Sequence, residues 1–252
     1  MTTYRYKLII EYDGTPFHGF QYQIGLSSVQ GELEKALSVL NNKKLPKIYV
    51  AGRTDAGVHA TAQVAHVDLE TNYEDFNVMQ AVNQQLRKNL RPQTISVIKA
   101  QHVEKEFHAR FSAKKRFYIY KIINRHSPSP LNINKAWHVY PTLNTDSMNK
   151  AAKILEGHHD FTSFRSVECQ SSNPTKTLDK LSVYKTNDLI TIEAVSQSFL
   201  HHQVRNIVGT LKLVGEEKWS SKDVKEALEA KDRRAAGPTA PASGLYLTKI
   251  EY

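Results

Sequence analysis

The 252-residue sequence predicts an α+β protein with largely antiparallel sheets. Two observations support this prediction. Strand-like segments outnumber helical ones, and many of them follow one another at hairpin spacing. In addition, the second half resembles a looser version of the first, which indicates two related α/β units without an identical repeat.

The first half is predicted to run in the order β-α-β-β-α-β. Tyr and aliphatic residues alternate with polar ones over residues 4–12, which predicts a strand with one apolar face. Ser27 and Gln30 have the spacing of a capping box and predict the start of a helix with an apolar stripe. The remaining elements are strands over 47–51 and 62–69, a helix from Phe76 to Leu90 that ends before Pro92, and a strand over 94–103.

The second half begins with a strong strand over 116–123, followed by a Pro-containing loop. A helix is predicted over 145–156, with Gly157 as its stop. The later elements are strands near 176–185 and 188–196, a helix around Val204–Val214, a short helix near 221–230 and a strand over 245–251. We therefore predict two ferredoxin-like or RRM-like α/β halves, residues 1–110 and 111–252.

Composition indicates a folded, soluble protein. Apolar residues make up 40% and charged residues 23%, and no run approaches the ~20 apolar residues that span a bilayer. The N-terminal residues lead directly into a strand pattern and lack a signal-peptide core, so we expect a cytoplasmic protein without membrane contact. The single cysteine, Cys169, excludes an internal disulfide framework and a multi-cysteine zinc site, and we assign it no role.

The net charge of +9 is gathered in small basic groups, for example Lys114-Lys115-Arg116 and Arg233-Arg234. Such groups suit a polyanion whose phosphates release counterions when they are neutralised. The alternative is a solvated basic surface that serves solubility. Charge alone therefore only slightly favours nucleic-acid binding.

Residues 51–60, AGRTDAGVHA, are the most informative segment. They place Asp55 between two glycines, directly after Arg53, in a bend between two strand-like segments. An Asp held in such a loop suits a nucleophile or base on a rigid frame. On local chemistry alone, an Asp that bonds to its own backbone in a turn is the more common case.

The segment Gly52 to Ala60 resembles the signature of tRNA pseudouridine synthases of the TruA family. Further blocks similar to this family occur along nearly the whole chain, in the expected order: Tyr12 to Thr15, Val29 to Glu34, Phe107 to Phe111, His159 to Phe164, Phe199 to Asn206 and Ala240 to Leu245. One departure is Phe20, where the family commonly has Trp. The aromatic ring is kept, but its N–H donor is lost.

The resemblance implies two domains whose sheets meet around a central basic cleft that contains the Asp loop. It implies an isomerase that converts uridine to pseudouridine by flipping the base, with Asp55 as the nucleophile and Arg205 paired with it. Tyr118 would stack on the target base, although Tyr120 two residues on illustrates a structural alternative. Arg53 is a weaker candidate, for contact with a phosphate or the flipped nucleotide.

We expect no cofactor and no metal, because the reaction yields an isomer and no zinc pattern is present. His201 and His202 are adjacent, so on a helix or strand their rings would point apart and would not easily chelate together.

The implied substrate is the anticodon stem-loop of tRNA at positions 38 to 40, and the implied assembly is a homodimer. The alternatives are a synthase for another tRNA position or for ribosomal RNA, and a catalytically silent RNA-binding paralogue.

Overall fold

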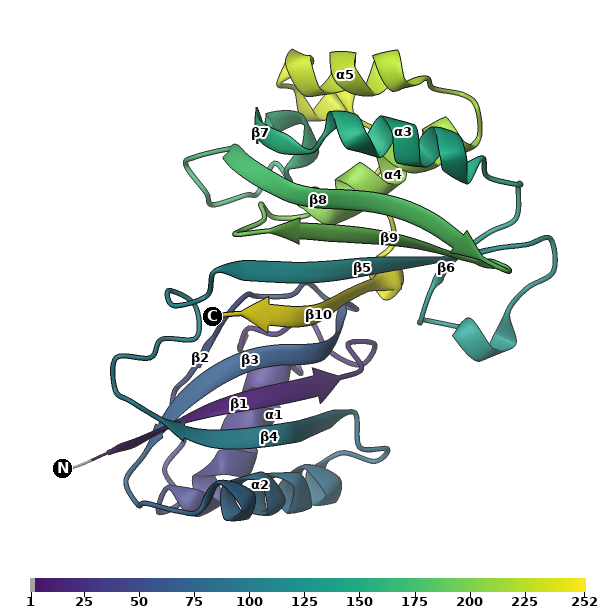
Figure 1. Cartoon of the computed structure of the whole chain (residues 1–252). Coiled ribbons are helices and arrows are strands. Elements are labelled where there is room, and N and C mark those ends of the chain that lie inside the picture. Colours follow the sequence, from purple (N-terminus) through teal and green to yellow (C-terminus); the bar gives the residue numbers. More distant parts are fainter. Residues whose placement is uncertain (1–2) are drawn as a thin grey trace. The chain divides into compact units, whose positions relative to one another are not determined.

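A computed structural model describes residues 3–252 and divides the chain into two compact units (Figure 1). Unit 1 extends to Lys114 and also contains Leu247–Tyr252, whereas unit 2 is Lys115–Tyr246. The predicted domains, 1–110 and 111–252, stay a prediction, because compact packing does not test whether a segment folds independently.

In unit 1 the strands β4, β1 and β3 lie in that order with antiparallel pairing, and the short strand β2 pairs with β3. Helix α2 packs against β4, and α1 packs against α2. The elements are β1 (Tyr4–Tyr12), α1 (Val29–Leu37), β2 (Ile48–Val50), β3 (His59–Leu69), α2 (Asp75–Asn89) and β4 (Ile95–Val103). This is the predicted β-α-β-β-α-β order.

The alternation in β1 produces the predicted apolar face, because Tyr6, Leu8 and Ile10 are fully buried. The start of α1 differs from the prediction by one residue. Ser28, not Ser27, is the N-cap, and its hydroxyl accepts a hydrogen bond from the Gly31 amide at 3.2 Å. Gln30 does not complete a capping box. Its side chain accepts from the Tyr22 amide and donates to Glu34.

Unit 2 has the strand order β5-β9-β8-β7, with antiparallel pairs throughout, and β6 adds to β5 in parallel. Helix α3 packs against β8, and α4 and α5 pack against α3. The elements are β5 (Lys115–Asn124), β6 (Trp137–Val139), α3 (Thr145–Ile154), β7 (Gly157–Asp160), β8 (Thr175–Thr186), β9 (Leu189–Ser196), α4 (Gln203–Gly215) and α5 (Ser221–Ala230). Strand β10 (Leu245–Glu251) begins in unit 2 and ends in unit 1.

The described residues confirm the α+β class with mainly antiparallel pairing. Two short strands, β6 and β7, were not predicted, because three or four residues are too few for a periodic pattern. Gly157 does not stop α3. The helix is capped at Leu155, and Gly157, with φ of 105°, starts β7. Five short 3₁₀ helices complete the described part: Ser38–Leu40, Pro130–Asn132, Thr162–Phe164, Arg233–Ala235 and Ala242–Gly244.

The helices of the described residues lack the length and apolar character of a membrane span. Within residues 3–252, every helix is too short or too polar to cross a lipid bilayer.

Candidate functional site

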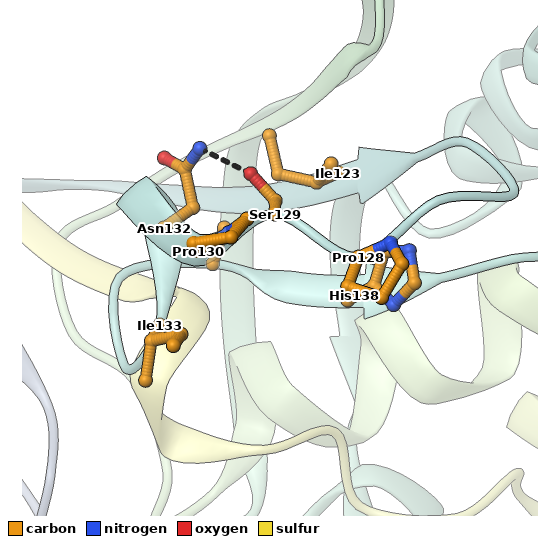
Figure 2. A pocket seen from close by; sticks show the side chains of 8 residues that line it. Ile123, Pro128, Ser129, Pro130, Asn132, Ile133 and His138 are labelled. Carbon is orange, nitrogen blue, oxygen red and sulfur yellow. Dashed lines mark hydrogen bonds between the residues drawn. The ribbon is translucent and has the colours of Figure 1, made fainter.

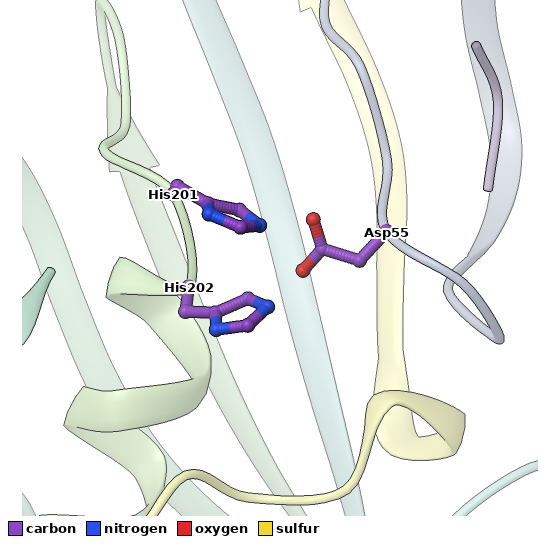
Figure 3. A group of neighbouring side chains, drawn as sticks. All are labelled: Asp55, His201 and His202. Atoms are coloured by element: carbon purple, nitrogen blue, oxygen red, sulfur yellow. The ribbon is translucent and has the colours of Figure 1, made fainter. Parts of the chain in front are cut away.

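Asp55 lies in unit 1, on the loop that joins β2 to β3 (Figure 3). Its side chain is half-buried, and Arg53 two residues earlier is exposed. Between them, Thr54 is buried, with 7% of its surface accessible. The loop therefore anchors itself through Thr54 and leaves Arg53 open to solvent.

Hydrogen bonds from three neighbouring elements hold this loop. The Tyr12 and Thr54 hydroxyls are 2.7 Å apart, and the Gln63 side chain donates to the Gly52 carbonyl at 2.7 Å. The Phe20 amide donates to the Thr54 carbonyl at 3.0 Å. Burial raises the pKa of Tyr12 to about 12, so its hydroxyl stays neutral beneath the loop. The backbone on both sides of Asp55 is thus fixed before any ligand binds.

The loop also depends on a close approach at Gly14. A Cβ atom on this residue would lie 2.0 Å from the Val58 carbonyl oxygen, a distance that real side chains do not adopt. The Gly14 amide donates to Nδ1 of the buried His59 at 3.1 Å. Gly57, with φ of 77°, supplies the left-handed turn after Asp55. Glycine at positions 14 and 57 therefore allows the loop to fold back onto the end of β1.

Phe20, the departure from the family pattern, is a core residue. Its ring is 1% exposed and lies 6.1 Å from the Tyr12 ring, and its backbone bonds both to Thr54 and to Gln30. An apolar ring suits this position, because a buried indole N–H would need an acceptor.

Tyr118 and Tyr120 lie two residues apart on β5 in unit 2 and have different environments. Tyr118 is half-buried and its ring meets Phe199 edge to face at 5.1 Å. Tyr120 is fully buried, and its hydroxyl donates to the Pro241 carbonyl at 2.7 Å. Burial raises the pKa of Tyr120 well above its ordinary value. Tyr120 is therefore structural, whereas the Tyr118 ring keeps an accessible surface.

Arg205 lies in the first turn of α4 in unit 2, and a loop from the C-terminal part of the unit holds it. Its Nε donates to the Ala240 carbonyl at 2.8 Å, and the Ala240 amide donates back to the Arg205 carbonyl at 3.1 Å. This reciprocal pair fixes the base of the guanidinium group. The loop comprises residues 236–244, so its position determines where the Ala240 carbonyl meets Nε.

Arg233 holds that loop, and sequence reasoning missed it. Its Nη1 donates to the Gly237 carbonyl at 2.9 Å, and its Nη2 donates to the side chains of Asn206 and Thr239, both at 3.1 Å. Thr239 also donates to Asn206 at 2.7 Å. Arg233 had been noticed only as part of a basic pair. The available signal for such a network was Asn206, a polar residue directly after Arg205 that is buried in an otherwise apolar helix.

The rings of His201 and His202 do not point apart, which corrects the expectation from sequence. Their centroids are 4.0 Å apart with an interplanar angle of 38°. The residues lie in a turn before α4, and His202 is the helix N-cap with a left-handed backbone, φ 63° and ψ 3°. This conformation turns two successive side chains to the same side, as the two rings in Figure 3 show.

Unit 2 also contains a pocket with a mainly apolar lining. It has a volume of about 210 Å³, and apolar atoms from Ile123, Pro128, Pro130 and Ile133 dominate its lining (Figure 2). Its one titratable residue, His138, uses Nε2 in a 2.9 Å hydrogen bond with the Arg125 carbonyl. None of the four predicted site residues lines it.

The four predicted site residues are divided equally between the units. The 51–58 loop brings Arg53 and Asp55 together in unit 1, and unit 2 carries Tyr118 on β5 and Arg205 on α4. Pairing of Arg205 with Asp55 stays a prediction.

Comparison with known proteins gives one consistent result. A family model described as tRNA pseudouridine synthase matches residues 8–112 and 151–252. The chain is 52% identical over 248 residues to tRNA pseudouridine synthase A of Paramagnetospirillum magneticum, with coverage of 98% of this chain and 95% of the relative. The proteins of the same name from Afipia carboxidovorans and Parvibaculum lavamentivorans are 49% and 50% identical over 98% of this chain and 99% of each relative.

Proposed function

The chain belongs to the tRNA pseudouridine synthase family, and we propose that it isomerises uridine to pseudouridine in the anticodon stem-loop of tRNA, at positions 38, 39 and 40. The observation that carries this proposal is the 51–58 loop. A half-buried carboxylate stands on a backbone that Tyr12, Gln63 and Phe20 fix from three sides. Such preorganisation suits a group that must meet one atom of a bound substrate.

The reaction breaks the C1′–N1 bond and forms a C1′–C5 bond, while a proton leaves C5 and another reaches N1. Atoms and electrons balance within the nucleoside, so no oxidant or reductant is required. Asp55 is the nucleophile in this proposal: its carboxylate forms a bond to the base or the sugar, and this bond breaks again by the time the C1′–C5 product is released, which returns the carboxylate. The target uridine lies in a stacked arm and must be flipped out, at a cost of a few kcal/mol.

The other three residues have supporting roles. Arg205 pairs with Asp55 in this proposal and orients its carboxylate through charge-assisted hydrogen bonds. The bonds from Ala240 hold Arg205 ready for this role. Tyr118 supplies an accessible ring for stacking on the flipped base, and the exposed Arg53 contacts a phosphate or the flipped nucleotide. The protein acts as a homodimer in the cytoplasm, without cofactor or metal.

The test uses unmodified tRNA transcripts with uridine at positions 38, 39 and 40. Wild-type protein is incubated with them without nucleotide, and pseudouridine is mapped by carbodiimide adducts and primer extension. We expect stops confined to these positions, and no stops with Asp55→Ala. Affinity of Asp55→Ala for tRNA should remain within about threefold of wild type, because phosphate contacts dominate affinity.

Each other outcome contradicts a defined part of the proposal. If Asp55→Ala still forms pseudouridine, Asp55 is not the nucleophile. Stops elsewhere in tRNA, or only in ribosomal RNA, show a synthase with a different target. Tight binding without any stops indicates a silent RNA-binding paralogue.

A further inference from the structure

Four aromatic rings in unit 1 form a continuous group, the aromatic ladder, defined here as Tyr49, His66, His108 and Phe111. Tyr49 and His66 are paired across β2 and β3, and their rings stack at 4.9 Å with an interplanar angle of 10°. His66 meets His108 edge to face at 4.7 Å, and His108 lies 4.4 Å from Phe111 at an angle of 32°. The ladder therefore has an exposed ring at each end and the buried His66 ring between them.

Backbone amides keep the two imidazoles of the ladder neutral. Nδ1 of His66 accepts a hydrogen bond from the Ala109 amide at 3.1 Å, and Nδ1 of His108 accepts from the Arg110 and Phe111 amides at 3.1 and 3.3 Å. A nitrogen that accepts carries no proton. Burial also lowers the pKa of both histidines, that of His66 to about 4. The ladder is thus an uncharged aromatic surface at neutral pH.

The outer rings of the ladder are exposed, and each has a cation beside it. Phe111 is 77% exposed, and the Arg110 guanidinium lies 5.7 Å from its centroid. Tyr49 is 39% exposed, and the Lys47 ammonium lies 5.1 Å from its ring. Aromatic faces beside positive charges match the bases and phosphates of a single nucleic-acid strand.

The segment that carries Phe111 is rigid. Arg5, in an ion pair with Asp68, donates to the Phe107 carbonyl at 2.9 Å. The His108 amide donates to the Ser112 hydroxyl at 3.0 Å, and the Tyr252 hydroxyl donates to the Ala109 carbonyl at 2.9 Å. The ring is therefore held in solvent by a structured turn. Such placement lowers the entropy lost when a ligand stacks on it.

We propose that Phe111, supported by His108 and flanked by Arg110, is a stacking site for an unpaired base of the RNA substrate. It lies outside the 51–58 loop and none of the four site residues takes part in it. The RNA class of the ligand rests on the proposed function. The site binds RNA and does not take part in bond making.

The experiment measures the dissociation constant for an unmodified tRNA transcript by filter binding at one fixed salt concentration. We expect Phe111→Ala to weaken binding about tenfold, the range found when a base loses an aromatic stacking partner, and Phe111→Leu to do the same. Phe111→Trp should bind as wild type does. Its additional fluorescence over wild type should be quenched when oligouridylate is added. Phe76→Ala, which removes another exposed ring of unit 1, is the matched control and should leave the constant unchanged.

A second measurement separates stacking from charge. Phe111→Ala should keep the wild-type salt dependence of binding, whereas Arg110→Gln should reduce the slope by about one. The proposal is wrong if Phe111→Ala binds as tightly as Phe76→Ala. It is also wrong if Phe111→Ala changes the sedimentation coefficient of the free protein, since Phe111 would then contact a second copy of the chain.

Failure of this inference differs from failure of the proposed function. If Phe111 is not a stacking site, the dissociation constant of Phe111→Ala for tRNA will equal that of wild type, whether or not the protein forms pseudouridine. If the proposed function is wrong, the wild-type protein will form no pseudouridine in tRNA, whatever its affinity for tRNA.

Discussion

Two loops hold the proposed catalytic pair, and they are fixed by different means. The 51–58 loop of unit 1 is held by uncharged groups of β1 and β3, through Tyr12 and Gln63. The 236–244 loop of unit 2 is held by a cation, Arg233, which bonds to both the loop and α4. The side chains of Thr210 and Tyr120 also bond to this loop. Both loops use a glycine for close approach: Gly14 under Val58 and Gly209 under Pro238. The first loop therefore depends on close packing and uncharged hydrogen-bonding groups, and the second depends on a guanidinium group as well.

The largest effect is expected from Gly209→Ala. Alanine in a helix interior is normally better than glycine by about 1 kcal/mol. Here its Cβ would lie 1.7 Å from the Pro238 carbonyl oxygen, so the loop must move away. We expect a loss of about 3 kcal/mol in the free energy of unfolding, measured by urea denaturation.

Gly215→Ala is the matched control for this substitution. Its Cβ would meet the Met148 sulfur at 2.7 Å, and a flexible thioether can move aside. An equal loss of stability in Gly209→Ala and Gly215→Ala would show that the substitution acts through helix α4 and not through the contact with the loop.

Gly14→Ala tests the other loop. Its Cβ would lie 2.0 Å from the Val58 oxygen, against 1.7 Å at Gly209, so the overlap is smaller. We expect a loss of about 2 kcal/mol in stability, together with a fall in single-turnover rate, because Asp55 shifts with the loop. A stable variant with wild-type turnover would show that the loop is not a rigid support.

Lowering the pH should lower the stability of unit 1, because the buried His66 resists protonation in the folded chain. Burial, with a smaller contribution from Arg5, lowers the pKa of His66 to about 4, against the ordinary value of 6.5. The unfolded chain gains a proton that the folded chain resists, so stability is full above pH 6.5 and falls as the pH drops towards 4. We expect a loss on the order of 2 kcal/mol over this window.

The measurement is the denaturation midpoint at a series of pH values. His66→Gln, whose oxygen can still accept from Ala109, should flatten the curve between pH 6.5 and 4. A curve as steep as that of wild type would assign the titration to other groups.

The smallest effect is expected from Arg233→Lys. Lysine keeps the charge but lacks the planar fork that reaches Gly237, Asn206 and Thr239 together. The Ala240 carbonyl then holds Arg205 less firmly. We expect about a tenfold lower kcat with KM unchanged, and about 1 kcal/mol less stability.

Arg234→Lys is the control, because Arg234 is exposed and its side chain bonds to Asp232. A rise in KM without a fall in kcat in Arg233→Lys would indicate that Arg233 serves RNA binding rather than the position of Arg205.

The contrast between the 51–58 loop and the 236–244 loop also explains what could be predicted from sequence. Asp55 could be proposed from sequence because its loop is one contiguous segment with glycines and an Arg in fixed positions, and its catalytic role stays a prediction. The elements of unit 1 followed from periodicity over nine or more residues, as in β1 and α2. The roles of Arg233 and Thr239 could not be predicted, because their partner Asn206 lies some thirty residues away and only the fold brings them together. The His201 and His202 geometry was predicted wrongly, since sequence did not indicate a left-handed residue at His202.

Strand β10 has a consequence for synthesis on the ribosome. Unit 1 needs Leu247–Tyr252, and these residues leave the ribosome only after the whole of unit 2. Until then Lys7 and Phe107 lack the Tyr252 ring, and the Ala109 carbonyl lacks its hydroxyl donor. A nascent chain therefore cannot finish its first unit before its second, and a chain released early carries an unfinished unit 1.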